Sequence, residues 1–183
     1  MEYARFTEGS NSVDYLDKAV SFIKSAQSKP EDWKWVILAS HGALYGFMIC
    51  TLKGSALDNV STGNKHRLID FSEALKRCQD PTFMSLGGFT RILRLSEEQR
   101  QALEDLHRDF RNKFVHYDGA FWSIDPDLIR VKVMHAFDAV RGVVEMGCWY
   151  PRFEPSDSEK IEALIIEGKA LLQKGSSGDN AAS

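Results

Sequence analysis

An arginine and a histidine lie close together in the segment RNKFVH (residues 111–116) and can together act on a phosphodiester. The planar guanidinium of Arg111 can clamp a phosphate through paired hydrogen bonds. The imidazole of His116, whose ordinary pKa is about 6.5, can take up or release a proton at neutral pH. The amide of Asn112 can orient the phosphate or the imidazole. These residue types predict phosphodiester cleavage that needs no metal or other cofactor.

Helix geometry limits how these side chains can meet. Asn112 and His116 are four residues apart and share one face of a helix. Arg111 and His116 are five residues apart, which is about 140° around an ideal helix, so they do not lie side by side. They converge only if the helix ends near His116, as Asp118-Gly119 predicts, or if a second chain completes the site.

Length and composition are those of one globular domain. The chain has 183 residues, 43% hydrophobic and 27% charged, and a formal net charge of −3. A chain of this size buries a substantial core. Sequence-blind nucleic-acid binders are usually basic, so we expect any nucleic-acid contact to come from a local patch. We predict a single domain over residues 1–174 and a disordered tail over residues 175–183.

Cysteine usage and the first residues favour a cytoplasmic protein. Cys50, Cys78 and Cys148 are far apart and odd in number, which argues against a disulfide framework or a zinc cluster and favours a reducing compartment. The opening residues, MEYARFTEGS, lack the basic and then apolar layout of a signal peptide.

Residues 36–52 form the most apolar stretch of the chain. A helix that is apolar on all sides belongs in a protein core or in a bilayer. The stretch falls just below the ~18–20 residues that a membrane span needs, and it contains Ser40, His41, Gly42 and Gly46. We favour a buried central helix. The alternative, a membrane-associated protein, would partition into the membrane fraction.

Apolar periodicity predicts an all-α bundle of five or six helices. The first expected helix begins at a cap within residues 10–12, the second covers about 32–53 and the third about 68–79. A fourth follows the capping box at 96–99, a fifth begins at Pro126 and a sixth begins at 156–157. Residues 54–65 are predicted to be a loop, and residues 81–95 show no clear period.

The helix after the capping box Ser96-Glu97-Glu98-Gln99 carries the RNKFVH segment near its end. Its predicted core stripe consists of Leu103, Leu106, Phe110 and Phe114, spaced by three, four and four residues. The RNKFVH segment therefore belongs to the end of an amphipathic helix, followed by an aromatic loop that reaches Trp122 and a helix that Asp125-Pro126 starts.

The segment resembles the mark of the HEPN superfamily of all-α domains. That mark is an arginine, often followed by a polar residue, with a histidine four to six residues later, at the end of a helix that leads through a loop into another helix. Arg111, Asn112 and His116 match it, and the resemblance covers about residues 13–150.

The resemblance implies a metal-independent endoribonuclease of the toxin or phage-defence type that works as a homodimer. RNA supplies its own nucleophile, the 2′-OH, and the reaction needs a base, an acid and a cation for the phosphate. One chain supplies one His116, and a two-fold dimer would bring a second. The expected products are a 2′,3′-cyclic phosphate and a 5′-OH, and a separately encoded antitoxin is a possible partner.

Other polar residues are weaker candidates. Lys113 and Arg108 can touch RNA phosphates, although i,i+4 pairing on the helix surface is the favoured account of both; Tyr117 can stack on a base, although packing is favoured. His107 is either a support for Arg111 or solvated. His41 is interpreted as a satisfied core histidine. No HExxH, P-loop or GxSxG pattern is present.

A non-catalytic alternative remains open at this stage. Arg111 and Asn112 can cap the helix or brace a dimer, and His116 can be a helix-terminal cation that complements the helix dipole. The chain would then be a HEPN-like dimerisation module or an RNA- or nucleotide-binding module.

Overall fold

The computed structural model of the chain describes residue 3 and residues 6–54, 56–62, 67–86, 91–116, 123–147 and 155–175. Tyr117, the loop that contains Trp122, and residues 176–183 of the predicted tail lie outside these ranges, so the predictions made for them stay predictions. The predicted domain end at residue 174 falls one residue before the end of the last helix.

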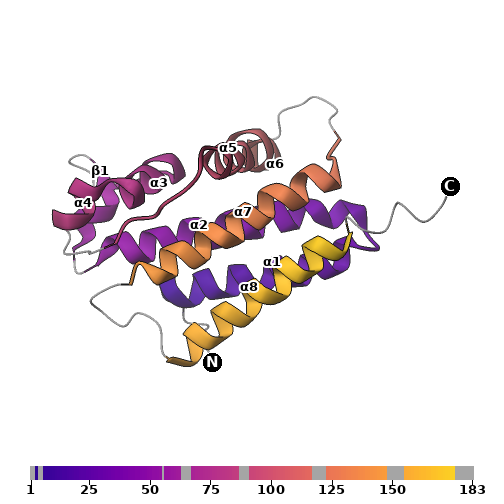
Figure 1. Cartoon of the computed structure of the whole chain (residues 1–183), viewed down its shortest axis with the longest axis horizontal. Coiled ribbons are helices and arrows are strands. Elements are labelled where there is room, and N and C mark those ends of the chain that lie inside the picture. The colour runs from indigo at the N-terminus through magenta and orange to yellow at the C-terminus, as the bar shows by residue number, and fades with distance from the viewer. Residues whose placement is uncertain are drawn as a thin grey trace.

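Four long helices form the bundle in Figure 1: α1 (Glu8–Ala26), α2 (Trp33–Lys53), α7 (Pro126–Glu145) and α8 (Pro155–Gly175). α1 packs on α2 and α8, and α7 packs on the same two helices, which closes a ring of four. Large side chains with almost no exposed surface fill its centre, among them Leu16, Phe47 and Phe137. Each such burial stabilises the fold by about 1.5–3 kcal/mol.

α2 is the central helix, as the sequence predicts. Its buried residues lie on all sides, because α1, α7 and the short helix α3 (Phe71–Gln79) each pack on it. By length and composition α2 is apolar enough to cross a membrane, a test that the buried core helix of a soluble protein also passes. It begins at Trp33, after a 3₁₀ turn (η1, Pro30–Asp32), and ends at Gly54, which has a positive φ of 46°.

The start of α1 differs from the prediction. The cap is Thr7 rather than a residue of 10–12: the Ser10 N–H donates to Thr7 Oγ1 at 3.0 Å, and the Thr7 N–H donates to Ser10 Oγ at 2.9 Å. This is a capping box in which serine replaces the usual Glu or Gln at the third helical position. The sequence suggests a cap in residues 10–12 because Ser10 is a good capping residue, but in this box Ser10 occupies the third helical position and its side chain accepts from the Thr7 N–H.

The connection from α2 to α3 has more structure than the predicted loop. It contains a 3₁₀ turn, η2 (Leu57–Val60), and two short antiparallel strands, β1 (Ser61–Thr62) and β2 (Arg67–Leu68). Leu68, which was assigned to the following helix, belongs to β2 and is exposed. Asp70 caps α3 by accepting a hydrogen bond from the Glu73 N–H at 2.8 Å.

The all-α prediction is confirmed, with a seventh helix in the described ranges. This helix, α4 (Pro81–Leu86), lies where no period was visible. Six residues are too few to display an apolar stripe. The Asp80 carboxylate accepts hydrogen bonds from the N–H groups of Thr82 and Phe83, so it caps α4.

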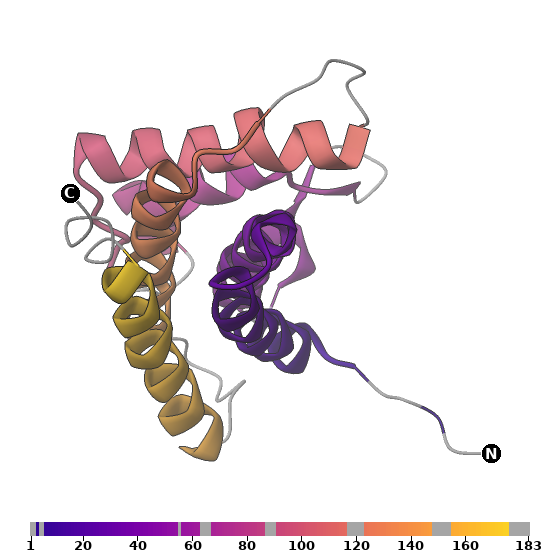
Figure 2. The same cartoon turned by 90° about the vertical axis from the view of Figure 1, so that its right-hand side faces the viewer.

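The helix that carries the RNKFVH segment runs across the long helices of the bundle (Figure 2). It consists of α5 (Glu97–Asp105), a π-helical segment η3 (Leu106–Arg111) and α6 (Asn112–His116), and we call it the motif helix. The predicted capping box at Ser96 is present. Of the predicted stripe, Leu103 and Leu106 are buried, while Phe110 and Phe114 are partly buried against the core.

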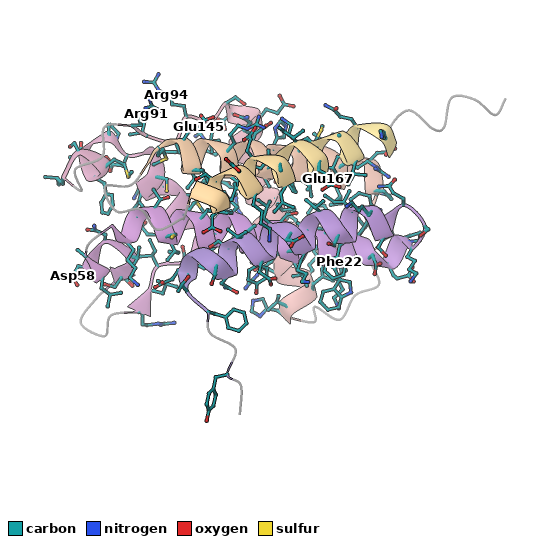
Figure 3. The ribbon with its side chains drawn as sticks, turned by 90° about the horizontal axis from the view of Figure 1, so that it is seen from below. Phe22, Asp58, Arg91, Arg94, Glu145 and Glu167 are labelled. Atoms are coloured by element: carbon teal, nitrogen blue, oxygen red, sulfur yellow. The ribbon has the colours of Figure 1, made fainter. Side chains whose placement is uncertain are left out.

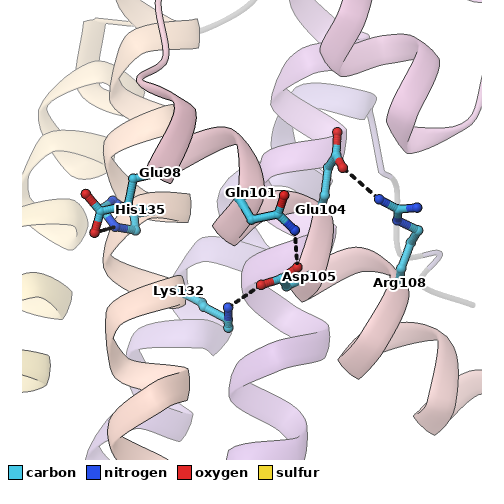
Figure 4. A network of polar contacts seen from close by, with 7 residues as sticks. All are labelled: Glu98, Gln101, Glu104, Asp105, Arg108, Lys132 and His135. Atoms are coloured by element: carbon cyan, nitrogen blue, oxygen red, sulfur yellow. Dashed lines mark hydrogen bonds and ion pairs between the residues drawn. The ribbon is translucent and has the colours of Figure 1, made fainter.

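A polar network holds α5 on α7 (Figure 4). The Lys132 ammonium donates to Asp105 Oδ2 at 2.5 Å, and Gln101 donates to Asp105 Oδ1 at 2.7 Å. Burial by itself would raise the pKa of Asp105, but the hydrogen bonds from Lys132 and Gln101 and the nearby cations outweigh it and lower that pKa. The carboxylate stays charged, so the pair fixes where the motif helix lies on the bundle.

Candidate functional site

Arg111 lies where the π-helical segment ends and α6 begins. The Asn112 N–H donates to the carbonyl of His107, five residues back, instead of four as in an α-helix. This wider turn keeps His107 and Arg111 on the side of the motif helix that packs on α2, since η3 contacts α2. Single π turns within α-helices are frequent at functional sites.

The Arg111 guanidinium is held by its neighbour. Its Nη1 donates to the side-chain carbonyl oxygen of Asn112 at 2.9 Å, and both side chains are half-buried. Arg111 also lines an open groove of about 780 Å³ between α1, α2 and α6. The guanidinium is therefore anchored on one side and accessible from the groove on the other.

Two histidines lie beside Arg111. His41 of α2 is buried, and its Nε2 is 2.9 Å from Nδ1 of the half-buried His107, so one neutral ring donates a hydrogen bond and the other accepts it. We call these two residues the His pair. Their rings are within 13° of parallel, and the Phe71 ring covers both, with centroids 4.5 Å from His41 and 4.8 Å from His107.

Both members of the His pair are held neutral. Burial, followed by the charges of His107 and Arg111, lowers the pKa of His41 to about 3. Burial and the Arg111 charge also lower the pKa of His107, although Asp70 acts in the opposite direction. A histidine whose pKa is about 3 is a poor proton carrier at pH 7, so His41 is suited to bracing the site rather than to acid–base chemistry.

Tyr45 and Asp70 complete the surroundings of the His pair. The Tyr45 hydroxyl donates to the carbonyl of Ile69, and burial, reinforced by the Asp70 charge, raises its pKa above the ordinary value. Because Asp70 caps α3, the same carboxylate fixes the first residue of that helix, Phe71, over the His pair. Residues of α2, α3 and the motif helix thus converge on the inner side of Arg111.

The structure does not bring Arg111 and His116 together within one chain. His116 is exposed at the end of α6 and makes no hydrogen bond or ion pair with any residue of the described ranges. Lys113 is also exposed. Arg108 is exposed and pairs with Glu104 at 2.7 Å, as the i,i+4 spacing predicts. Tyr117 lies outside the described residues.

The sequence does not predict the contact between the two members of the His pair. His41 was interpreted as a satisfied core histidine, which it is, but its partner was not foreseen because His107 is 66 residues away. The sequence favours a solvated His107 over a support for Arg111, and this expectation is wrong, because His107 is half-buried and hydrogen-bonded to His41. The usable signal was the four-residue spacing of His107 and Arg111, which places both on one helix face.

Comparison of the chain with models of known protein families, with curated proteins and with solved structures finds no match. Within the described residues, no group of three or more His, Cys, Asp or Glu side chains is arranged to hold a metal ion.

Proposed function

We propose that this chain is a HEPN-like, metal-independent endoribonuclease that works as a homodimer in the cytoplasm, as a toxin or defence effector. The observation that carries the proposal is the anchoring of Arg111 by Asn112 at the edge of a groove, with an exposed histidine, His116, at the end of the same helix. A guanidinium such as that of Arg111 can hold a phosphate, and an imidazole such as that of His116 can take up and release a proton.

The proposed reaction uses the 2′-OH of RNA. One His116 takes the proton of the 2′-OH as its oxygen attacks phosphorus, and Arg111 stabilises the charge that builds on the phosphoryl oxygens. The bond from phosphorus to the 5′ oxygen breaks, and a second histidine protonates that oxygen. The products are a 2′,3′-cyclic phosphate and a 5′-OH.

The second histidine comes from the partner protomer. Among the described residues, His41 and His107 are the other histidines near Arg111, and the lowered pKa of each disfavours it as the acid at neutral pH. A two-fold axis close to the exposed end of α6 would bring two copies of His116 into one site. The exposed Val115, beside His116, offers apolar surface for that contact.

A non-catalytic HEPN-like binding module is the second candidate. It is favoured by the separation of Arg111 from His116 within one chain and by the apolar character of the groove beside Arg111. In that case Arg111 would bind RNA or a nucleotide without any proton transfer. Lys113 and Arg108 would contact phosphates in either case.

The test is cleavage of mixed single-stranded and structured RNA in EDTA by the wild type, Arg111→Ala and His116→Ala. The matched control is Arg100→Ala, which removes an exposed arginine of α5 that pairs only with Glu97 among the contacts described. We expect the wild type and the control to cut, both motif variants to lose at least about a hundredfold in rate, and 2′-deoxy substrates to stay intact.

Two results would refute the enzymatic proposal. Equal cleavage by all four proteins would point to a contaminating nuclease. No cleavage by any of them, with RNA still bound in an Arg111-dependent manner, would establish the binding module instead.

A further inference from the structure

The groove beside Arg111 carries aromatic rings on its walls. Tyr15 of α1 and Trp35 of α2 line it, and they are 40% and 45% exposed. Phe22, labelled on α1 in Figure 3, also lines the groove and stacks on Trp35, with ring centroids 6.0 Å apart and planes within 25°. Exposed aromatic rings that face a groove are typical of a binding surface.

These rings are fixed in place before any ligand arrives. Trp35 is stacked on Phe22 on one side, and the Lys34 ammonium lies 4.8 Å from the centre of its ring. Tyr15 lies against the backbone of α2 at Gly42, where an added Cβ would be only 2.8 Å from the tyrosine ring. A planar ligand therefore meets pre-positioned rings, and little side-chain entropy is lost when it binds.

The charges that line the groove favour an anion. Among the described residues that line it, the cations are Arg111 and Lys18 and the acids are Glu8 and Asp14. Glu8 is paired with Lys53, which is not one of these lining residues, so the charge balance of the other three is positive. A ligand that combines a flat aromatic ring with a negative charge matches this lining, and a nucleotide is such a ligand.

We infer that the groove binds an unpaired base of single-stranded RNA, stacked on Trp35 and Tyr15, with the adjacent phosphate at Arg111. This inference rests on the proposed function and specifies its substrate: RNA whose base next to the scissile phosphate is unpaired. A base within a duplex is stacked between its neighbours and cannot enter the groove. Double-stranded RNA is therefore a poor ligand.

A second basic groove on the molecule is less suited to RNA. Arg91 and Arg94 line it beside Glu145 at the other side of the view in Figure 3, and Arg91 already donates to the carbonyl of Glu145 at 3.1 Å. Among the described residues that line that groove there is no aromatic ring, whereas the described lining of the groove beside Arg111 supplies both the rings and the cation.

The test measures binding separately from cleavage. The probe is a fluorescently labelled, single-stranded 2′-O-methyl RNA of mixed sequence, which lacks the nucleophile and cannot be cut, alone or annealed to its complement. Its Kd is measured by anisotropy for the wild type, Trp35→Ala, Trp35→Phe and Tyr15→Ala. Ile166→Ala, which removes an exposed apolar side chain from α8, is the control.

We expect Trp35→Ala and Tyr15→Ala each to raise the Kd by about fivefold to a hundredfold, because stacking of one base is worth about that factor. Trp35→Phe keeps a stacking face and should raise it only a few-fold, Ile166→Ala should leave it unchanged, and the duplex should bind more weakly than the single strand. Circular dichroism checks that each variant is folded.

Unchanged single-strand binding by folded Trp35→Ala and Tyr15→Ala would overturn the inference. So would loss of a dimer in Trp35→Ala with RNA binding intact, since the groove would then be a contact between two copies of this chain. Normal, Trp35-dependent binding without cleavage of ordinary RNA would uphold the groove and refute the ribonuclease. Cleavage that Trp35→Ala does not slow would uphold the ribonuclease and refute the groove as its RNA-binding site.

Discussion

His41 and His107 share a hydrogen bond between Nε2 and Nδ1, 2.9 Å apart, beneath the ring of Phe71. The two rings join the central helix α2 to the π-helical segment at the point where Arg111 faces the groove. Both imidazoles are held neutral, so Arg111 does not face a second positive charge at close range. The His pair thus braces the inner side of the motif helix.

Removing both members of the His pair should destabilise the fold by less than the sum of the two single removals. In His107→Leu, the ring nitrogen of the buried His41 loses its partner, which costs about 1–3 kcal/mol of unfolding free energy. In the double variant His41→Leu/His107→Leu, no polar group is stranded, so the loss should be smaller than the sum of the two single losses. Urea unfolding at pH 7 of all four proteins in the cycle measures the coupling, and additive effects would show that the pair contributes nothing as a pair.

Acid should destabilise the wild type through the same residues. The folded pKa of His41 is about 3 against about 6.5 in the unfolded chain, so between these pH values the unfolded chain binds a proton that the folded chain does not. The unfolding free energy should be constant above about pH 6.5 and should fall below it by about 1.4 kcal/mol per pH unit for each such proton. His107, with its lowered pKa, adds in the same direction.

The control for this pH dependence is His41→Leu/His107→Leu. From pH 6.5 to pH 4.5, its unfolding free energy should decline less steeply than that of the wild type. The difference in slope should be at least about 1.4 kcal/mol per pH unit, which corresponds to one proton. Parallel curves for the wild type and the double variant would contradict the assignment of the acid sensitivity to the His pair.

Mixed dimers should reveal whether each site uses two copies of His116. If the wild type and His116→Ala are co-refolded in equal amounts, a site that needs both histidines is intact in roughly one quarter of the dimers. Cleavage should then fall to about a quarter and vary with the square of the wild-type fraction. A linear dependence, with about half of the activity left, would mean that each chain works alone.

The ion pair between Lys132 and Asp105 should be important for stability. Lys132→Met leaves the partly buried carboxylate of Asp105 without its cation, and we expect a loss of about 1–3 kcal/mol in unfolding free energy. Replacing both partners by apolar residues should cost less. Glu97→Ala, which breaks the exposed pair with Arg100, is the matched control and should cost less than about 1 kcal/mol in the same urea experiment.

Two helical glycines should respond in opposite ways to alanine. At Gly168, an added Cβ would lie 2.3 Å from the Phe137 ring, which is buried, so Gly168→Ala should destabilise the fold by about 1–3 kcal/mol despite its better helix propensity. At Gly142, the nearest atom is Cδ1 of Leu93, at the end of a flexible side chain, so Gly142→Ala should be neutral or slightly stabilising. Thermal unfolding of both variants tests the contrast.

Much of the fold could be predicted from local sequence signals. The caps at Ser96 and Asp125, the proline that opens α7 and the apolar surface of α2 each act within a few residues, and the structure contains all of them. α4 is not predicted because it is too short to show a period, and the cap of α1 is predicted at the wrong residue because Thr7 and Ser10 cap one another.

The candidate site was harder to predict, because its contacts are not local. The sequence predicts that Arg111 and Asn112 act at one site, but it does not predict the hydrogen bond between them, because successive residues of a helix do not face each other. The contact of His107 with His41 depends on how the motif helix crosses α2, which apolar periodicity does not specify. The aromatic lining of the groove likewise combines residues of α1 and α2 that no single helix pattern connects.

The π-helical segment makes the site sensitive to residue number as well as to residue identity. Over residues 106–111 the chain uses a wider turn than the α-helices on either side of it. Deletion of one exposed residue there, such as Asp109, would let the helix continue as an ordinary α-helix while rotating Arg111 relative to His107. Such a protein would keep every residue of the RNKFVH segment and lose their placement. A redesign that turns this segment into a regular α-helix for stability would remove the π turn that sets the orientation of Arg111.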